Sequence, residues 1–340
     1  MLEIHILHAG ITHPSPYFYN FCLNLDKYAE IKYTIDPNLP TNAPKDNGII
    51  YFNRLKRFYD SDDINSVDSF LEKIKYLKSI GWKIVWTVHN FFPIDRTITN
   101  VDEFITEEFI KKCDLVFTLS EYLKQQIKNI YEINAINHGM GFNKLDNRFN
   151  NNLVNNFKKD KFVYTFVGNI YKYKMLDKIV ENFNKIDNAY LIIAGKESKN
   201  AHVDVENLII KNKNIFFFNG FIGSEDWEKL ENITDVFVNI YDLDLPAFKY
   251  GFFPSNYINI YNTGIKCISP RHKAIEEMMD EEQMIYYDFH DKNGLLKAMK
   301  YAKNNDLCIL ENNVNNKYNW DKVIECFVEN CMRLFYENQI

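Results

Sequence analysis

Short apolar runs alternate with amphipathic segments through the first 140 residues of the chain. Apolar residues that recur at helical spacing predict helices at Tyr17–Tyr28, Ile64–Ile80, Thr99–Lys112 and Glu121–Ile130. Runs of β-branched and aromatic residues predict strands at Leu2–His8, Ile31–Ile35, Gly48–Asn53, Lys83–Val88, Leu115–Leu119 and Ala135–Asn137. Strands that alternate with helices in this way are typical of a parallel sheet covered on both faces.

A polar stretch rich in asparagine, residues 143–160, interrupts the pattern and predicts a linker. Beyond it, strands are expected at Phe162–Val167, Ala189–Ala194, Ile215–Phe218, Val236–Ile240, Cys267–Ser269 and Met284–Tyr287. Helices are expected at Leu176–Ile186, Val203–Lys211, Ser224–Glu231, Pro254–Asn262, Ala274–Asp280, Gly294–Asn304 and Trp320–Gln339. The pattern therefore predicts two doubly wound α/β domains, residues 1–150 and 151–318, and a last helix within residues 319–340.

The charge balance argues against a general nucleic-acid binder, because 40 basic and 46 acidic residues give a net charge of −6. Basic clusters occur at residues 54–57, 111–112 and 158–161, and each is expected to be a solvated surface. Two such clusters on one face of the first domain would favour attachment to an anionic membrane surface. The six cysteines have no metal-ligand spacing, so we expect no metal site.

The ends and the apolar runs of the chain predict its location. The first strand begins at Leu2 with no basic and apolar leader before it, so we expect no signal peptide. No apolar run approaches the roughly 20 residues of a membrane-spanning helix. We therefore expect a cytoplasmic protein that works in solution or at the surface of the cytoplasmic membrane.

The junction at residues 163–175 carries the chemistry that the pattern indicates most directly. A strand stops at Gly168, a short loop carries Lys172 and Lys174, and an amphipathic helix begins at Leu176. A strand that turns into a helix in this way leaves backbone N–H groups free, and a lysine adds a full positive charge. This arrangement predicts a phosphate site, although an ordinary strand–helix junction with solvated lysines has the same pattern.

Several further segments, in the right order, make the chain resemble the GT-B glycosyltransferases, and within them the bacterial enzymes of glycosyltransferase family four. The motif f-x-G-x-i-x-x-Y-K of that family corresponds to Phe166–Lys174, which includes Tyr173. The other matching segments are Lys83–Pro93 with its Thr-Val-His-Asn sequence, Asp114–Glu121, Asn137–Gly139, Leu191–Lys196, Asp235–Tyr241, Asn262–Pro270 and Asn319–Asp321.

The resemblance implies two Rossmann-like domains that face each other across a cleft, with a final helix that crosses back to the first domain. It implies the transfer of a hexose from a nucleotide diphosphate sugar to a hydroxyl group of a glycan or lipid-linked acceptor, in surface polysaccharide or glycoconjugate assembly. No cofactor or metal is required in such a mechanism, because fixed positive groups stabilise the leaving diphosphate. The expected partners are the donor, the acceptor and the inner membrane, and no nucleic acid.

In the second domain the resemblance assigns donor contacts along the loops that follow the strands. Lys174 corresponds to the lysine that binds the donor phosphate, and the Gly168–Asn169 turn would approach the phosphates. Ser255 and Asn256 begin a helix whose N-terminus would bind an anion. The nucleobase is expected near Gly195 and Phe221. The paired glutamates of the family are replaced by Gly251 and Asn259, of which only Asn259 can bind a ribose hydroxyl group.

In the first domain the resemblance assigns His89 to the donor sugar and gives it a catalytic role, because a histidine can donate a hydrogen bond or carry a proton. His138 and Gly10 lie in loops that would approach the donor. Asp95 is a candidate base for an inverting reaction. The family likeness favours retention of the anomeric configuration instead, with the leaving phosphate accepting the proton. A sugar-nucleotide epimerase and a non-catalytic GT-B subunit of another transferase remain as alternatives.

Overall fold

The computed structural model describes residues 1–8, 16–94, 96–142, 157, 159–197, 204–311 and 314–336. The chain divides into two compact units. Unit 1 contains Met1–Asn143, Pro246–Phe253 and Asn315–Ile340, and unit 2 contains Lys144–Leu245 and Pro254–Val314. The predicted domain boundary at residues 150 and 151 lies outside the described residues.

Unit 1 is built on a parallel six-stranded sheet with the order β2-β1-β3-β4-β5-β6. Its strands are β1 (Leu2–Leu7), β2 (Ile31–Asp36), β3 (Asn47–Phe52), β4 (Lys83–Val88), β5 (Leu115–Thr118) and β6 (Ile136–Asn137). Because successive side chains of a strand point to opposite faces, Phe52 and Trp86 enter the core on one face, while Tyr51 and Thr87 lie on the other.

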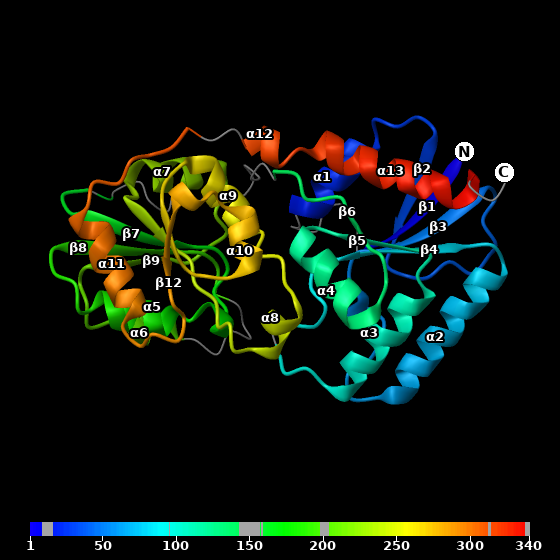
Figure 1. The fold of residues 1–340 in the computed structure, drawn as a ribbon, viewed down its shortest axis with the longest axis horizontal. Helices are drawn as coiled ribbons and strands as arrows, with labels where there is room; N and C mark the ends of the chain where they lie inside the picture. The colour runs from blue at the N-terminus through cyan, green and yellow to red at the C-terminus, as the bar shows by residue number, and fades with distance from the viewer. Residues whose placement is uncertain are drawn as a thin grey trace. The chain divides into compact units, whose positions relative to one another are not determined.

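Helices cover both faces of this sheet (Figure 1). Side chains of α2 (Ile64–Ser79), α3 (Asn100–Lys112) and α4 (Glu121–Tyr131) pack in the core that contains Phe52 and Trp86. The opposite face carries α1 (Pro16–Leu25) and α13 (Trp320–Tyr336), which lie side by side. Within that layer the ring of Phe327 lies 5.1 Å from the rings of both Phe21 and Tyr51. The predicted return of the last helix to the first domain is confirmed.

The segment Pro246–Phe253 also belongs to unit 1, although the chain on either side of it belongs to unit 2. It contains α8 (Pro246–Tyr250), and after that helix Phe252 forms a β-bridge with Asn90. The sequence pattern did not predict α8, because a helix of five residues is too short to show an amphipathic period. Pro246 at its first position suits a helix start, since proline lacks the N–H that would remain unpaired there.

Unit 2 contains a second parallel six-stranded sheet, with the order β12-β11-β10-β7-β8-β9. Its strands are β7 (Phe162–Val167), β8 (Ala189–Ala194), β9 (Ile215–Phe218), β10 (Val236–Val238), β11 (Cys267–Pro270) and β12 (Met284–Tyr287). The order places β7 and β10 at the centre, where the connections leave toward opposite edges. Ligands of open parallel sheets lie beyond the carboxyl ends of such central strands.

The helices of unit 2 again lie on both faces of its sheet (Figure 1). They are α5 (Leu176–Phe183), α6 (Val205–Ile209), α7 (Ser224–Ile233), α9 (Asn256–Thr263), α10 (Lys273–Met278) and α11 (Gly294–Asn304). Side chains of α5, α6 and α11 form one core with Tyr164 and Phe166 of β7. On the opposite face, Trp227 of α7 stacks on Phe237 of β10 with ring centroids 5.8 Å apart.

The predicted strands are all present, and five of them have the predicted ends: β4, β7, β8, β9 and β12. The predicted helices are present as well; α11 has the predicted ends, and the ends of the others differ by a few residues. The short α12 (Val314–Lys317) and the 3-10 turns at Leu55–Arg57, Lys172–Lys174 and Glu281–Gln283 were not predicted. Among the described residues, no helix is both long and apolar enough to span a membrane.

Candidate functional site

The turn after β7 brings a glycine and a lysine together in unit 2. Gly168 has φ +117°, a conformation that side chains disfavour, and its N–H donates to the carbonyl of Ala194. A Cβ atom on Gly168 would lie 2.9 Å from Nζ of Lys174 and 3.4 Å from Nδ2 of Asn256. The side chains of Lys174 and Asn256 therefore converge on the face of Gly168 that glycine leaves open.

Gly195, at the end of the neighbouring strand β8, touches the same turn. A Cβ atom there would lie 2.0 Å from the carbonyl oxygen of Gly168, which no side chain could occupy. The two strand ends are further joined by a hydrogen bond from the N–H of Ile170 to the carbonyl of Lys196. Gly195 thus has a structural role in this close approach of backbones, and its predicted contact with a nucleobase stays a prediction.

Lys174 is the charged centre of the turn. It ends a 3-10 turn, Lys172–Lys174, and its side chain is only 6% exposed, whereas Lys172 is exposed. Burial lowers the pKa of Lys174 to about 8. Its Nζ lies 5.7 Å from the ring centre of Phe166, and no acidic side chain of the described residues forms an ion pair with it. A buried cation without a countercharge is a favourable place for an anion.

Helix α9 begins beside this lysine. Asn256, its first residue, donates from Nδ2 to the carbonyl of Val167 at 2.9 Å, which fixes the start of the helix against the end of β7. Ser255 is exposed and its side chain caps no backbone N–H. The N–H groups of Tyr257 and Ile258 donate to the carbonyls of Pro254 and Ser255. What this helix start offers to a ligand is therefore the hydroxyl group of Ser255 and the positive end of the helix dipole. Asn259 lies one turn further along the same helix and is partly buried.

Tyrosines line the other side of the turn. Tyr173 stacks on Tyr171 with ring centroids 5.2 Å apart, and on Tyr241 at 6.2 Å. The carbonyl of Tyr173 also accepts a hydrogen bond from the N–H of Asp242. These contacts hold the loop of Lys174 against the loop that follows β10. Tyr173 therefore has a structural role in positioning the loop of Lys174.

Phe221 follows β9, at the edge of the same sheet. Nζ of Lys196 lies 4.5 Å from the centre of its ring, and Lys196 itself is exposed. The N–H of Gly220 reaches the carbonyl of Gly195 at 3.4 Å. Gly195 and Phe221 therefore follow the neighbouring strands β8 and β9. Two residues that contact the same nucleobase must lie close together in this way. Asn169 is exposed in the turn after Gly168.

In unit 1, a chain of neutral hydrogen bonds passes through His138. The hydroxyl group of Tyr51 donates to Oγ1 of Thr87 at 2.9 Å, and Oγ1 of Thr87 lies 3.3 Å from Nε2 of His138. Nδ1 of His138 lies 2.7 Å from the carbonyl of Gly139, so Nδ1 carries the proton and Nε2 accepts from Thr87. Burial lowers the pKa of His138 to about 4. Both ring nitrogens of His138 are thus occupied within unit 1.

His89 follows β4 on the same face of the sheet. Its ring meets that of Tyr17 edge to face, with centroids 4.6 Å apart, and its Nε2 is enclosed without a hydrogen-bond partner among the described residues. Burial, followed by the charge of Arg54, lowers the pKa of His89 to about 3. At neutral pH the side chain is therefore an uncharged imidazole, which can exchange hydrogen bonds but cannot act as a proton donor of ordinary strength.

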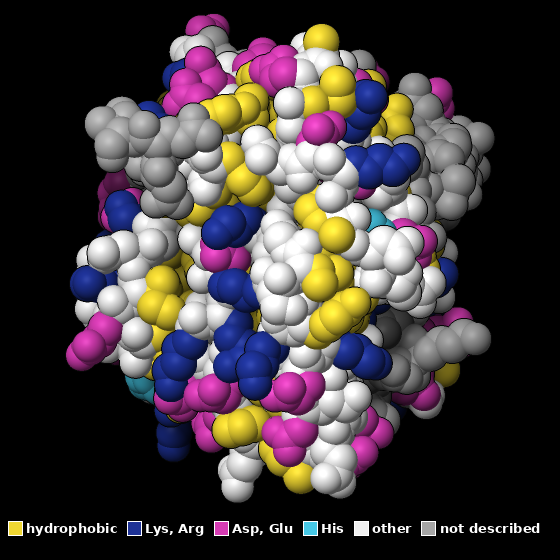
Figure 2. All heavy atoms as spheres, turned by 90° about the vertical axis from the view of Figure 1, so that its right-hand side faces the viewer, with side chains coloured by type: hydrophobic (Ala, Val, Ile, Leu, Met, Phe, Trp, Pro, Cys, Tyr) yellow, Lys and Arg dark blue, Asp and Glu magenta, His cyan; other side chains and the backbone are white. Residues whose placement is uncertain are grey.

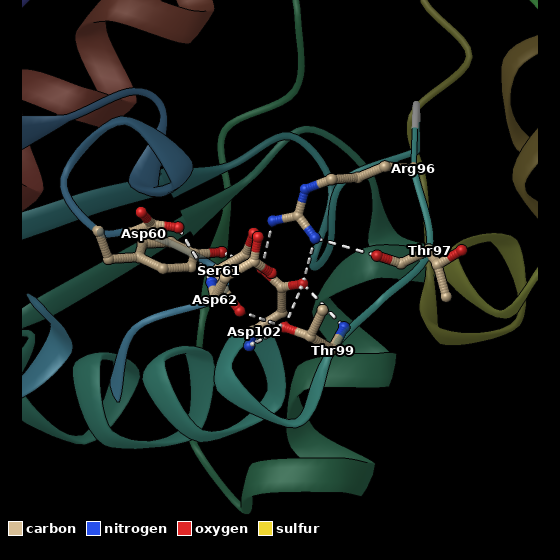
Figure 3. A network of polar contacts seen from close by, with 8 residues as sticks. Asp60, Ser61, Asp62, Arg96, Thr97, Thr99 and Asp102 are labelled. Carbon is tan, nitrogen blue, oxygen red and sulfur yellow. Dashed lines mark hydrogen bonds and ion pairs between the residues drawn. The ribbon is translucent and has the colours of Figure 1, made fainter. Parts of the chain in front are cut away.

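The loop after His89 is anchored at its far end by a network around Asp102 (Figure 3). The carboxylate of Asp102, fully buried in the first turn of α3, accepts 2.6 and 2.7 Å hydrogen bonds from the guanidinium of Arg96. The N–H and hydroxyl group of Thr99 and the hydroxyl group of Tyr59 also donate to it. Burial disfavours the charge of Asp102, but these donors outweigh burial and lower its pKa. Asp95 precedes Arg96 and, like Gly10, lies outside the described residues.

Charged side chains of both signs share the face drawn in Figure 2, where lysine and arginine side chains gather with acidic ones beside them. On α3, Lys111 pairs with Glu107 at 2.6 Å, and Lys112 pairs with Glu108 at 3.6 Å. This predicted basic cluster is therefore largely neutralised within its own helix. Over the part of the chain that the structure describes, no group of histidine, cysteine and acidic residues could hold a metal ion.

A comparison with known protein families identifies the family of this chain. The sequence profile of the family described as "Glycosyl transferases group 1" matches residues 147–319, just over half of the chain. The chain belongs to the glycosyl transferases group 1 family. It is therefore a glycosyltransferase, and the matched region includes Lys174, Gly195 and the start of α9. The more specific assignment to family four stays a prediction. No curated protein matches this glycosyltransferase.

Solved structures with the GT-B fold resemble the whole glycosyltransferase at low sequence identity. Sucrose-phosphate synthase from Thermosynechococcus elongatus has a TM-score of 0.70 at 13% identity, over 99% of this chain and 100% of its own. Anabaena HepE, crystallised with UDP-glucose, has a TM-score of 0.65 at 9% identity, over 97% and 99% of the two chains. The lipopolysaccharide outer core galactosyltransferase WaaB has a TM-score of 0.61 at 12% identity, over 99% and 100%. The predicted GT-B fold is confirmed.

Residues that the sequence did not single out also lie at the strand ends of this glycosyltransferase. Asn239, directly after β10, is 1% exposed, and its side-chain amide lies near the hydroxyl group of Tyr241. In unit 1, Oδ1 of Asn53 is enclosed and has no hydrogen-bond partner among the described residues. No motif marks these positions, and the pairing of a side-chain atom depends on neighbours that only the folded chain brings together.

Proposed function

We propose that this glycosyltransferase transfers a hexose from a nucleotide diphosphate sugar to a hydroxyl group of a glycan or lipid-linked acceptor. The observation that carries the proposal is the buried ammonium of Lys174, which faces the open side of Gly168 beside the start of α9. A diphosphate is the ligand that this cation and the adjacent helix N-terminus suit, since both attract negative charge. Anabaena HepE, of the same fold, was crystallised with UDP-glucose, which supports a donor of this class.

In the proposed reaction, the bond between the anomeric carbon and the phosphate oxygen breaks, and a bond from that carbon to the acceptor oxygen forms. Negative charge grows on the leaving diphosphate, and Lys174 and the positive end of α9 stabilise it. The proton of the acceptor hydroxyl passes to the leaving phosphate, and the product retains the anomeric configuration. We propose no metal and no cofactor, because these fixed groups supply the positive charge.

The proposed roles of the other predicted residues follow from this reaction. His89, uncharged at neutral pH, would bind a sugar hydroxyl group rather than transfer a proton. Asn259 would bind the ribose, and Phe221 would lie near the nucleobase. A base at Asp95 belongs to the alternative, inverting reaction. The anomer of the product, observed by NMR spectroscopy, separates the two reactions.

The setting of this activity is part of the same proposal. We propose that the enzyme works in the cytoplasm, in the assembly of surface polysaccharide or glycoconjugates. We also propose that it belongs to glycosyltransferase family four. A lipid-linked acceptor would bring it to the surface of the inner membrane. Co-sedimentation with vesicles that carry anionic lipids tests this attachment.

Replacement of Lys174 tests the donor role directly. We expect Lys174→Ala to lower kcat/KM for the donor about 100-fold, as loss of a group that stabilises developing negative charge does. Lys172→Ala is the matched control, since Lys172 belongs to the same turn but is exposed, and it should stay within about twofold of wild type. Release of the nucleoside diphosphate from UDP-, GDP- and TDP-sugars provides the measurement.

The product formed in this assay distinguishes the proposed transferase from the two alternative functions. Formation of an isomerised nucleotide sugar would show an epimerase, and absence of donor binding by calorimetry would show a non-catalytic subunit. Donor turnover by Lys174→Ala within about twofold of wild type would refute the phosphate role of this lysine.

A further inference from the structure

The segment Pro246–Phe253 is packed into unit 1, although the residues on both sides of it belong to unit 2. Phe248 and Phe252 are only 1% and 2% exposed, and their rings meet edge to face with centroids 4.4 Å apart. Tyr250 and Phe253 pack against the aromatic core of unit 1. Burial of these rings orders the segment, because loose loops bury few apolar side chains.

Within unit 1, this segment is attached to the start of the loop that follows β4. Asn90 forms a β-bridge with Phe252, and Oδ1 of Asn90 accepts a 3.3 Å hydrogen bond from the N–H of Phe253. The ring of Phe92 meets that of Tyr250 edge to face, with centroids 4.9 Å apart. The helix of the segment and its last residue therefore both contact the same loop.

Gly251 lies where the segment approaches unit 1 most closely. Its φ is +135°, and a Cβ atom on it would lie 2.9 Å from Cδ2 of Leu123 and 3.1 Å from the ring of Phe91. A side chain at this position would push the segment away from both residues. The glycine therefore permits the close contact on which the attachment depends.

The same segment leads directly to the proposed phosphate site of unit 2. Pro254 is joined to Phe253 by a peptide bond, and α9 begins two residues later at Asn256. Because three residues of extended chain span at most about 11 Å, Cα of Asn256 cannot lie further than this from Cα of Phe253. The side chain of Asn256 faces the open side of Gly168, beside Nζ of Lys174.

We propose that Asn90 is a positioning residue for the diphosphate site. Its side-chain oxygen holds the end of the segment in unit 1 and thereby fixes the chain from which α9 begins. A helix start that is already fixed loses less conformational freedom when a ligand binds, so the ligand binds more tightly. Asn90 acts through Phe253 and needs no contact with the ligand. The inference rests on the proposed function for the identity of that ligand.

Removal of the side-chain oxygen of Asn90 tests this role. We expect Asn90→Ala to weaken binding of the nucleoside diphosphate at least about fivefold, because the ligand must then order the chain that precedes α9. Asn90→Asp keeps an oxygen acceptor at the same place and should bind within about twofold of wild type. The measurement is calorimetric titration with UDP, GDP and TDP, below the melting temperature of every variant. The variants are compared on the diphosphate that the wild type binds.

A merely structural role of Asn90 gives a different result, namely a lower melting temperature with unchanged affinity of the folded protein. Asp63→Ala is the matched control in unit 1, because it removes a side-chain oxygen that accepts a 2.9 Å hydrogen bond from the N–H of Asn65. It should bind the diphosphate within about twofold of wild type. Tyr250→Ala removes the contact with Phe92 and should also weaken binding, so it carries the test if Asn90→Ala does not fold.

Three results would overturn the inference. They are affinity within about twofold of wild type in both Asn90→Ala and Tyr250→Ala, an equal loss in Asp63→Ala, and a loss in Asn90→Asp as large as that in Asn90→Ala.

Lys174→Ala, titrated in parallel, separates these failures from failure of the proposed function. If Lys174→Ala binds more weakly and Asn90→Ala does not, only the role of Asn90 fails. If Asn90→Ala binds more weakly and Lys174→Ala does not, the phosphate role of Lys174 fails and the role of Asn90 in nucleotide binding stands. A wild-type protein that binds none of the three diphosphates would refute both.

Discussion

At the scale of single residues, Lys174 shows how burial prepares a charged group for its ligand. Its ammonium lies under the turn of Gly168 without an ion-pair partner in the described part of the chain, and burial lowers its pKa to about 8. The folded protein without ligand therefore holds a proton less tightly at Lys174 than the unfolded chain does. A bound diphosphate would restore the affinity of Lys174 for its proton.

A pH dependence follows from this shift. Because the pKa of Lys174 is lower in the folded state than its ordinary value of 10.5, the stability of the unliganded protein should rise between about pH 8 and pH 10.5. The affinity for UDP should fall by about tenfold from pH 7 to pH 9, as the cation of the folded protein loses its proton. Calorimetric titration at these two pH values measures the change. Equal loss in Lys174→Ala would contradict the assignment.

At the scale of elements, the network of Asp102 connects three segments that are far apart in the sequence. Asp102 lies in α3, Tyr59 lies between β3 and α2, and Arg96 lies in the loop after β4. Figure 3 shows Arg96 and Thr99 directed at the carboxylate from the same loop. Since the loop begins at His89, the network fixes the far end of the segment that carries a candidate site residue.

We therefore expect Asp102→Asn to destabilise the protein by about 3 kcal/mol, because it removes the countercharge of Arg96 and leaves buried donors unpaired. The lowered pKa of Asp102 means that the wild type gains this stability above the ordinary carboxyl pKa of 3.8 and loses it as the pH falls further. Urea unfolding at pH 7 and pH 3.5 measures both effects. The control on the same helix, Glu107→Gln, breaks an exposed pair and should cost less than about 0.5 kcal/mol.

At the scale of the whole molecule, unit 1 is assembled from three separate parts of the chain. Its last part, α13, completes the face of the sheet that β1–β6 and α1 leave open. Phe327 at its middle is fully buried and contacts the rings of Phe21, Tyr51 and Phe117. The N-terminal half of the chain therefore cannot bury its own aromatic core without the C-terminal helix.

Phe327→Ala should destabilise unit 1 by about 4 kcal/mol, because it opens a cavity among these rings. Thermal unfolding followed by circular dichroism should show an earlier transition. Tyr336→Ala, at an exposed position near the end of the same helix, should leave that transition unchanged. An equal effect of the two substitutions would mean that α13 does not complete this core.

The sequence by itself determined the parallel sheets, nearly every element and the position of Lys174 at a strand end. These features depend on local periodicity and on the order of strands and turns, which a linear pattern records. It also indicated the family through segments such as Phe166–Lys174, whose place in the chain is itself the signal.

Only the tertiary structure decided which side chains lack partners and which segments join unit 1. The burial of Lys174, the enclosed Oδ1 of Asn53, and the return of Pro246–Phe253 and α13 to unit 1 all depend on contacts between distant residues. From the sequence, His89 could either donate a hydrogen bond or transfer a proton, whereas in the folded protein burial lowers its pKa and keeps the side chain neutral. The solvent exposure of an atom and its hydrogen-bond partners depend on residues that are distant in the sequence, so a local sequence pattern cannot predict them.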